Sequence, residues 1–115
     1  MGWPPQVGEV LPRAAECWHE PIKFGEWILA PRGHGPEWER VFGVTDEDRG
    51  RVWEAIAAAA IGAAIVEVRD RSPFGIACGV EAQVTIGEHS ATVTMSWHYA
   101  TPEAAPRLAT AYPSP

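Results

Sequence analysis

The chain has 115 residues, 46% of them hydrophobic and 21% charged, and its formal net charge at neutral pH is −6. These values are ordinary for one soluble globular domain. They exclude a membrane-spanning helix, which needs ~18 consecutive apolar residues, because the most apolar run, 55–68, is interrupted by Gly62. The acidic balance also weighs against nonspecific binding of nucleic acid, because phosphate contacts need Lys and Arg.

The N-terminal residues show no basic segment followed by an apolar one, so we expect a cytoplasmic protein, with export by a non-Sec route left open. Cys17 and Cys78 lie far apart in the sequence. Two free thiols are favoured over a disulfide. No spacing is typical of a zinc site, and we expect neither a metal nor a cofactor. The oligomeric state is left open.

Two short helices are predicted in the first third of the chain, which is rich in Pro and Gly. Residues 21–29 form the first, with a proline in its first turn and Ile22, Trp27 and Ile28 as candidate core contacts. Residues 36–43 form the second, which begins at a proline and ends at a glycine.

The strongest helical pattern covers residues 45–62. Thr45 is the expected N-cap, and its spacing to Asp48 is that of a capping-box variant. The acidic residues of the first turn complement the helix dipole. Apolar residues recur at helical spacing and define the stripe expected to be buried: Val52, Trp53, Ile56, Ala59 and Ala60.

After Gly62 the apolar period changes from 3.6 to 2 residues, which predicts four strands, at 64–70, 76–86, 90–99 and 107–112. Their short connections favour antiparallel pairing. Helices followed by strands predict an α+β fold, with two or three N-terminal helices packed on one face of a four-stranded antiparallel sheet. Residues 1–115 then form a single domain, helical over about 20–62 and sheet over about 63–113.

The alternation gives the sheet a core face and an open face. Trp97 is expected in the core, with Val84, Val93 and Met95, against Trp53 and Ile56, whereas Ser96 and His98 share the open face. In the last strand Leu108, Thr110 and Tyr112 are expected on one side, and Arg107 on the other unless a bulge intervenes.

Pairing of the last two strands would bring His98, Thr110 and Tyr112 together on the open face. Histidine titrates near neutral pH, and the other two supply a hydroxyl and a phenol. With a cation such as Arg107 or Arg32, this set suffices for metal-free cleavage of RNA. In that reaction a base takes the 2′-hydroxyl proton, an acid protonates the leaving oxygen, and cations stabilise the phosphorane.

His34, in a Gly-flanked loop, is a further catalytic candidate, and Arg32, Ser96 and Trp38 are candidates for substrate binding. A solvated sheet face carries Ser, Thr and His without any function, so the ordinary structural interpretation stays open. His19 and His89 are expected to be surface residues.

A resemblance becomes visible in the order of short segments along the chain: "LPRA", "IKFGEWILAP", "HGPEWERVFGVT", "FGIACGV", "ATVTMSW" and "PRLATAYP". In this order they resemble an uncharacterised bacterial domain family that occurs alone and at the C-termini of polymorphic toxins. The ending is also similar to the final strand of the barnase–EndoU–colicin–RelE toxin ribonucleases. That group has helices followed by a four-stranded antiparallel sheet whose open face cleaves RNA.

The resemblance implies that Thr110 and Tyr112 are site residues, with Arg107 a weaker candidate. It also implies RNA or a cognate immunity protein as partner. One position departs from the pattern, because Trp38 stands where a lysine is expected; His34 or Arg32 would have to replace that cation.

Three functions follow as alternatives. The first is a small toxin-type effector that is a metal-independent endoribonuclease, which the terminal Thr110–Tyr112 pair favours. The second is a non-catalytic, immunity-like protein-binding module on the same fold, which Trp38 and the acidic charge favour. The third is a small-molecule enzyme that uses His98 or Tyr112 for proton transfer.

Overall fold

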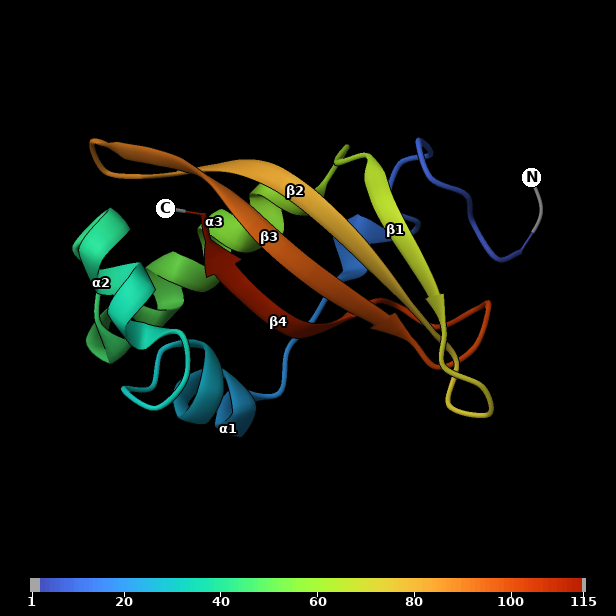
Figure 1. Ribbon diagram of the computed structural model, residues 1–115, viewed down its shortest axis with the longest axis horizontal. Helices are drawn as coiled ribbons and strands as arrows, with labels where there is room; N and C mark the ends of the chain where they lie inside the picture. Colours follow the sequence, from blue (N-terminus) through green and yellow to red (C-terminus); the bar gives the residue numbers. More distant parts are fainter. Residues whose placement is uncertain (1–2, 115) are drawn as a thin grey trace.

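Four strands form one antiparallel sheet in the order β1-β2-β3-β4 in the computed structural model, which describes residues 3–114 (Figure 1). The strands are β1 (Ile65–Asp70), β2 (Ile76–Ile86), β3 (His89–Tyr99) and β4 (Arg107–Pro113). Three helices precede them: α1 (Pro21–Lys23), α2 (Gly35–Phe42) and α3 (Arg49–Ala60). Short 3-10 turns lie at Ala14–Glu16 and Asp46–Asp48, and a π-helical turn at Phe24–Ile28 extends α1. The predicted α+β class is confirmed.

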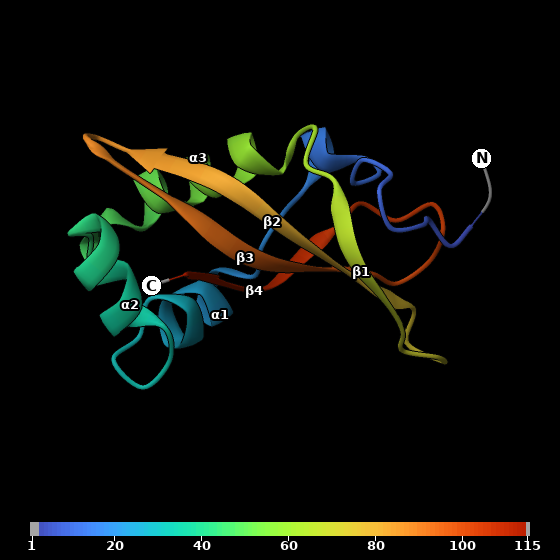
Figure 2. The ribbon, with the colours of Figure 1, turned by 45° about the horizontal axis from the view of Figure 1, so that its top comes forward.

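Helix α3 covers one face of the sheet, whereas α1 and α2 lie next to β4 (Figure 2). The core between α3 and the sheet contains Val52 and Ile56 together with Val84, Met95 and Trp97, all fully buried. The Trp97 ring lies 6.2 Å from the ring of Trp53. The predicted core face of β2 and β3 is therefore confirmed.

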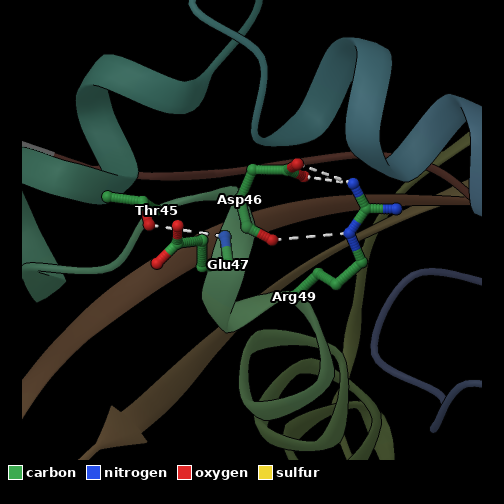
Figure 3. Close-up of polar contacts among 4 residues, drawn as sticks. All are labelled: Thr45, Asp46, Glu47 and Arg49. Atoms are coloured by element: carbon green, nitrogen blue, oxygen red, sulfur yellow. Dashed lines mark hydrogen bonds and ion pairs between the residues drawn. The ribbon is translucent and has the colours of Figure 1, made fainter.

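The start of α3 is fixed by local hydrogen bonds (Figure 3). Thr45 Oγ1 accepts from the backbone N–H of Glu47 at 3.3 Å. The backbone N–H of Thr45 also donates to Asp48 Oδ2 at 3.0 Å. Arg49 binds both carboxylate oxygens of Asp46, at 2.6 and 2.7 Å. The predicted capping box is present. It pairs backbone donors that a helix start otherwise leaves unpaired.

The first helix presents a different face to the core from the one expected. Phe24 and Ile28 are buried, but Ile22 and Trp27 are exposed, with 72% and 45% of their surface accessible. Ile22 precedes Phe24 by two residues, which is about 200° around a helix, so the two cannot both face inward. The prediction was wrong for Ile22 and Trp27 and right for Ile28.

A β-bulge in β4 changes the register in which β3 and β4 pair. Ser96 pairs with Thr110, but the next residue, Trp97, pairs with Leu108, so Ala109 is the extra residue. Leu108 therefore turns into the core, and Arg107 lies opposite His98 on the open face. The expected common side for Leu108 and Thr110 was wrong because an extra residue reverses the alternation.

The N-terminal segment pairs with both edges of the sheet. Leu11 N–H donates to Ala63 O at 3.0 Å, near β1, and Leu108 N–H donates to Trp18 O at 2.9 Å, along β4. These bonds cover edge groups that would otherwise be free to pair with another chain. Within residues 3–114, no helix has both the length and the apolar character needed to cross a membrane.

Candidate functional site

The open face of the sheet is hollowed into a groove that runs over all four strands. Its floor consists of small side chains on the three strands β2, β3 and β4: Ala77, Gly79, Ser96 and Ala109. One wall comes from β1 and the turn after it, with Glu67, Arg69 and Arg71. The other comes from β4 and from Lys23 at the end of α1. We call this feature the groove.

The strand register arranges the groove in three rows across the sheet. The first row is Glu81, Thr94 and Tyr112; the second is Glu67, Gly79, Ser96 and Thr110; the third is Arg69, Ala77, His98 and Arg107. Neighbouring rows are two residues apart in β3, or about 7 Å. The groove therefore has a Tyr112 end and a His98 end.

Glu67 lies over the floor of the groove. A Cβ atom on Gly79 would lie 3.4 Å from Glu67 Cβ and 3.7 Å from Glu67 Oε1. The absence of a side chain at Gly79 thus leaves the Glu67 carboxylate open to the middle row. Arg69 Nε lies 3.3 Å from Glu67 Oε2 and so partly neutralises that carboxylate.

Basic side chains are concentrated in the groove. Four of the nine in the chain line it (Lys23, Arg69, Arg71 and Arg107), against two carboxylates, Glu67 and Glu81. The local formal charge is therefore positive in a protein of net charge −6. Arg107 Nη1 lies 3.7 Å from Glu20 Oε1. Among residues 3–114, Lys23 and Arg71 have no carboxylate within 4.0 Å and stay free to bind an anion.

Five residues that the sequence singled out line the groove, namely Ser96, His98, Arg107, Thr110 and Tyr112. His98 and Arg107 face each other across β3 and β4. Tyr112 pairs with Thr94, four residues from His98 along β3, or about 13 Å. The structure therefore brings Thr110 and Arg107 close to His98, but places Tyr112 at the other end.

The Thr110 hydroxyl is turned into the protein. Its Oγ1 is buried, and no hydrogen-bond partner lies within reach of it among the described residues. A buried polar group without a partner costs about 1–3 kcal/mol. The hydroxyl is thus buried although the residue lines the groove.

His34 lies against Tyr112 rather than next to His98. The two rings stack at 4.8 Å, and Trp27 packs against His34 edge-on at 5.5 Å. His34 Nδ1 lies 2.8 Å from Glu37 Oε2, which fixes the orientation of the imidazole. Arg32 is exposed on the same loop but does not line the groove.

Trp38 is fully buried, so the expected contact with substrate is wrong. Its Nε1 donates to Ala111 O at 3.1 Å, and its ring stacks on Phe42 at 5.2 Å. The residue occupies the inner side of an amphipathic helix, where a side chain packs and does not bind. No cation is present at position 38, and the lysine that lines the groove is Lys23.

His19 is also not the surface residue that was expected. Its ring lies 4.8 Å from Phe24 and 4.5 Å from Trp53, and its Nδ1 is buried without a partner in the described part of the chain. Its aromatic neighbours come from segments far apart in sequence. His89 is exposed at the start of β3, as expected.

The sequence did not identify the β1 wall or Lys23. The signal that could have identified the wall is a period of two, which places Glu67, Arg69 and Arg71 on one side of the strand and the turn after it. Nothing local identifies Lys23, because α1 reaches the groove only through the packing of the helical segment on β4.

The cysteines lie outside the groove and are free. Burial raises the pKa of the Cys78 thiol to about 11 and also raises the pKa of Cys17. Both are therefore protonated thiols near neutral pH, which makes them poor nucleophiles. Within residues 3–114, no three His, Cys, Asp or Glu side chains are gathered as a metal site.

No model of a known protein family matches the chain, and searches of curated proteins and of solved structures return no significant match either. The resemblance to toxin ribonucleases therefore stays a prediction that rests on the short segments quoted above.

Proposed function

We propose that this protein is an endoribonuclease that cleaves RNA in the groove by acid–base catalysis. The observation that carries the proposal is the placement of His98 and Glu67 in a basic groove on an otherwise acidic protein. A local excess of cations attracts a phosphodiester chain despite the net charge. A histidine and a carboxylate together provide an acid and a base.

In the proposed reaction, Glu67 accepts the proton of the ribose 2′-hydroxyl, and the 2′-oxygen attacks the adjacent phosphorus. The bond from phosphorus to the 5′-oxygen breaks, and protonated His98 donates its proton to that leaving oxygen. The products are a 2′,3′-cyclic phosphate and a 5′-hydroxyl, so atoms and charge balance. The two side chains lie in neighbouring rows, on β1 and β3, with only the small residues of the floor between them.

Lys23, Arg71 and Arg107 stabilise the negative charge that develops on the phosphorane. Lys23 and Arg71 are suited to this role because neither has an ion-pair partner among the described residues. Arg107 is held next to His98 by the bulge in β4. A toxin-type effector role follows from the resemblance, since uncontrolled RNA cleavage arrests growth.

The test uses fluorescently labelled RNA oligonucleotides of varied sequence and matched DNA oligonucleotides. We expect cleavage of RNA with a 2′,3′-cyclic phosphate product and none of DNA, which lacks the attacking hydroxyl. His98→Ala and Glu67→Gln should each lower the rate by about 10²–10⁴-fold. Gln83→Leu, on the same sheet face but outside the groove, is the control. A parent protein that cleaves no RNA and does not arrest growth would exclude the proposal.

A protein-binding role is the second candidate, because large apolar side chains are exposed on the N-terminal part, Trp18 and Ile22 among them. Exposed apolar side chains of this kind often mark a protein interface. A double substitution, Trp18→Ser with Ile22→Ser, would abolish binding of a cognate partner but leave RNA cleavage unchanged. If the parent shows partner binding and no cleavage, this second function replaces the first.

A further inference from the structure

Three aromatic rings form a continuous row, called the ladder below, at the Tyr112 end of the groove; two come from one helical segment and the third from β4. Trp27 follows α1, His34 precedes α2, and Tyr112 is near the end of β4. Tyr112 stacks on His34 with an angle of 29° between the rings, and His34 contacts Trp27 at 77°. Their centroid separations, 4.8 and 5.5 Å, are those of direct ring contact.

The ladder holds the Tyr112 ring in place. One side of the ring is covered by His34, whose own imidazole is fixed by Glu37 at 2.8 Å. The strand that carries Tyr112 is anchored one residue earlier, where Trp38 Nε1 donates to Ala111 O. Tyr112 nevertheless remains 36% exposed and lines the groove. A rigid aromatic ring with an accessible surface next to a basic groove is the arrangement that binds an unpaired base by stacking.

The position of Tyr112 separates it from the chemistry at His98. The two residues lie in the outer rows of the groove, about 13 Å apart along the sheet. A phenol at this distance does not reach the leaving oxygen that His98 protonates. It reaches a flanking nucleotide of the same strand, whose backbone the free cations of the groove would hold.

We propose that Tyr112, supported by His34 and Trp27, is a stacking subsite for an unpaired nucleobase next to the cleaved phosphodiester. This inference rests on the proposed function, and it restricts the substrate to single-stranded RNA, because a base within a duplex cannot stack on a protein ring. In this role the Tyr112 ring is needed and its hydroxyl is not. The resemblance to toxin ribonucleases assigns the residue to the site but does not distinguish these roles.

The test uses binding, so that it does not depend on cleavage. The probe is a short 2′-O-methyl RNA, which has no attacking hydroxyl, with 2-aminopurine replacing each base in turn. At one position we expect the fluorescence to be quenched on binding, as the base stacks. Tyr112→Leu should abolish this quenching and weaken binding by about 5- to 150-fold, the range for loss of one stacked base at 1–3 kcal/mol. Tyr112→Phe should keep the quenching and bind within about threefold of the parent, and Gln83→Leu should match the parent.

Three other results would overturn the inference. If the probe binds but Tyr112→Leu binds equally well, the subsite does not exist, while RNA cleavage by the parent would still support the proposed function. If Tyr112→Phe retains probe binding but loses 10²-fold or more in kcat on cleavable RNA, the phenol acts in proton transfer instead. If the parent neither binds the probe nor cleaves RNA, both proposals fail together.

Discussion

Trp38 in α2 donates a hydrogen bond to the carbonyl oxygen of Ala111 in β4, across 73 positions of sequence. The bond is 3.1 Å long and lies one residue from Tyr112. It connects the helical part of the chain to the strand that forms one side of the groove. The helical part therefore determines where that strand lies, besides covering the core.

Replacing Trp38 tests its structural role. Trp38→Phe should lower the free energy of unfolding by about 1–3 kcal/mol, because the Ala111 carbonyl loses its partner in a buried place. Trp38→Lys, which restores the residue that the toxin resemblance expects, should prevent stable folding, since it buries an unpaired charge. Urea denaturation measures both, with the exposed neighbour Glu39→Ala as control. A stable Trp38→Lys protein with higher RNA cleavage would show that position 38 belongs to the site.

Trp97 is the largest core side chain on β3 and packs against Trp53. Trp97→Ala should cost about 3–5 kcal/mol, because it leaves a large cavity in the middle of the sheet. Domains of this kind have only about 5–15 kcal/mol of stability, so the thermal midpoint should fall steeply. Thr92→Ala, on the exposed side of the same strand, should change little. A Trp97→Ala protein that melts within a few degrees of the parent would contradict the assigned register.

Thr110→Val separates function from stability. The substitution removes a buried hydroxyl without a partner and keeps the shape of the side chain, so the free energy of unfolding should stay equal or rise by up to about 1 kcal/mol. If the hydroxyl turns toward the bound phosphate, kcat/KM for RNA should fall by about 10- to 100-fold, the loss of one hydrogen bond to a charged group. Thr92→Val is the matched control. Unchanged cleavage by Thr110→Val would make Thr110 a packing residue only.

The burial of a thiol, Cys78, and a phenol, Tyr99, predicts that the protein loses stability at alkaline pH. Burial raises the pKa of Cys78 from 9.0 to about 11, and burial also raises the pKa of Tyr99, whose hydroxyl donates to Pro12 O at 2.5 Å. Between pH 9 and 11 the unfolded chain has lost protons that the folded protein still holds, so the free energy of unfolding falls as the pH rises. Below pH 9 both states are protonated and this effect disappears.

The contribution of Cys78 over that interval is on the order of 2–3 kcal/mol. It is measured as the slope of unfolding free energy against pH for the parent and for Cys78→Ala, the latter corrected for its lower stability at pH 7. The variant should have a smaller slope, and the slope that remains should be due mainly to Tyr99. Equal slopes would show that the Cys78 thiol ionises normally in the folded state.

Filling the groove at Gly79 should stop function without unfolding the protein. A Cβ at this position makes only ordinary contact with Glu67, and a side chain in a strand replaces the flexibility of glycine. Gly79→Leu should therefore fold at least as stably as the parent but lose RNA binding and cleavage. Gln83→Leu adds a similar side chain on the same strand and face, outside the groove, and should retain both. Full activity of Gly79→Leu would place the site elsewhere.

The elements could be predicted because their signals are local. The period of two in 76–86 and 90–99 gave the two long strands and their core face, and the Thr45–Asp48 capping box gave the start of the long helix. His98 and Ser96 were correctly placed on the open face for the same reason. Side-chain direction in a strand follows directly from sequence position once the strand and one buried residue are known.

Predictions failed where long-range packing decides the outcome. The extra residue Ala109 reversed the alternation of β4, which moved Leu108 into the core and Arg107 to the groove. A bulge depends on how two strands fit, and neither strand alone encodes it. Likewise, Trp38 was assigned to substrate binding at the position where the resemblance expects a lysine, and only its packing against Ala111 shows that its side chain is buried.

The sequence by itself determined the class of fold, the order of the elements and the open face on which His98 lies, because hydrophobic period and capping act between near neighbours. The tertiary structure alone decided that Lys23, Glu67 and Arg71 share a groove with His98. It also decided that His34 stacks on Tyr112 and does not lie next to His98. Those contacts join segments tens of residues apart. They depend on the shapes of packed surfaces, which no periodicity within a single segment records.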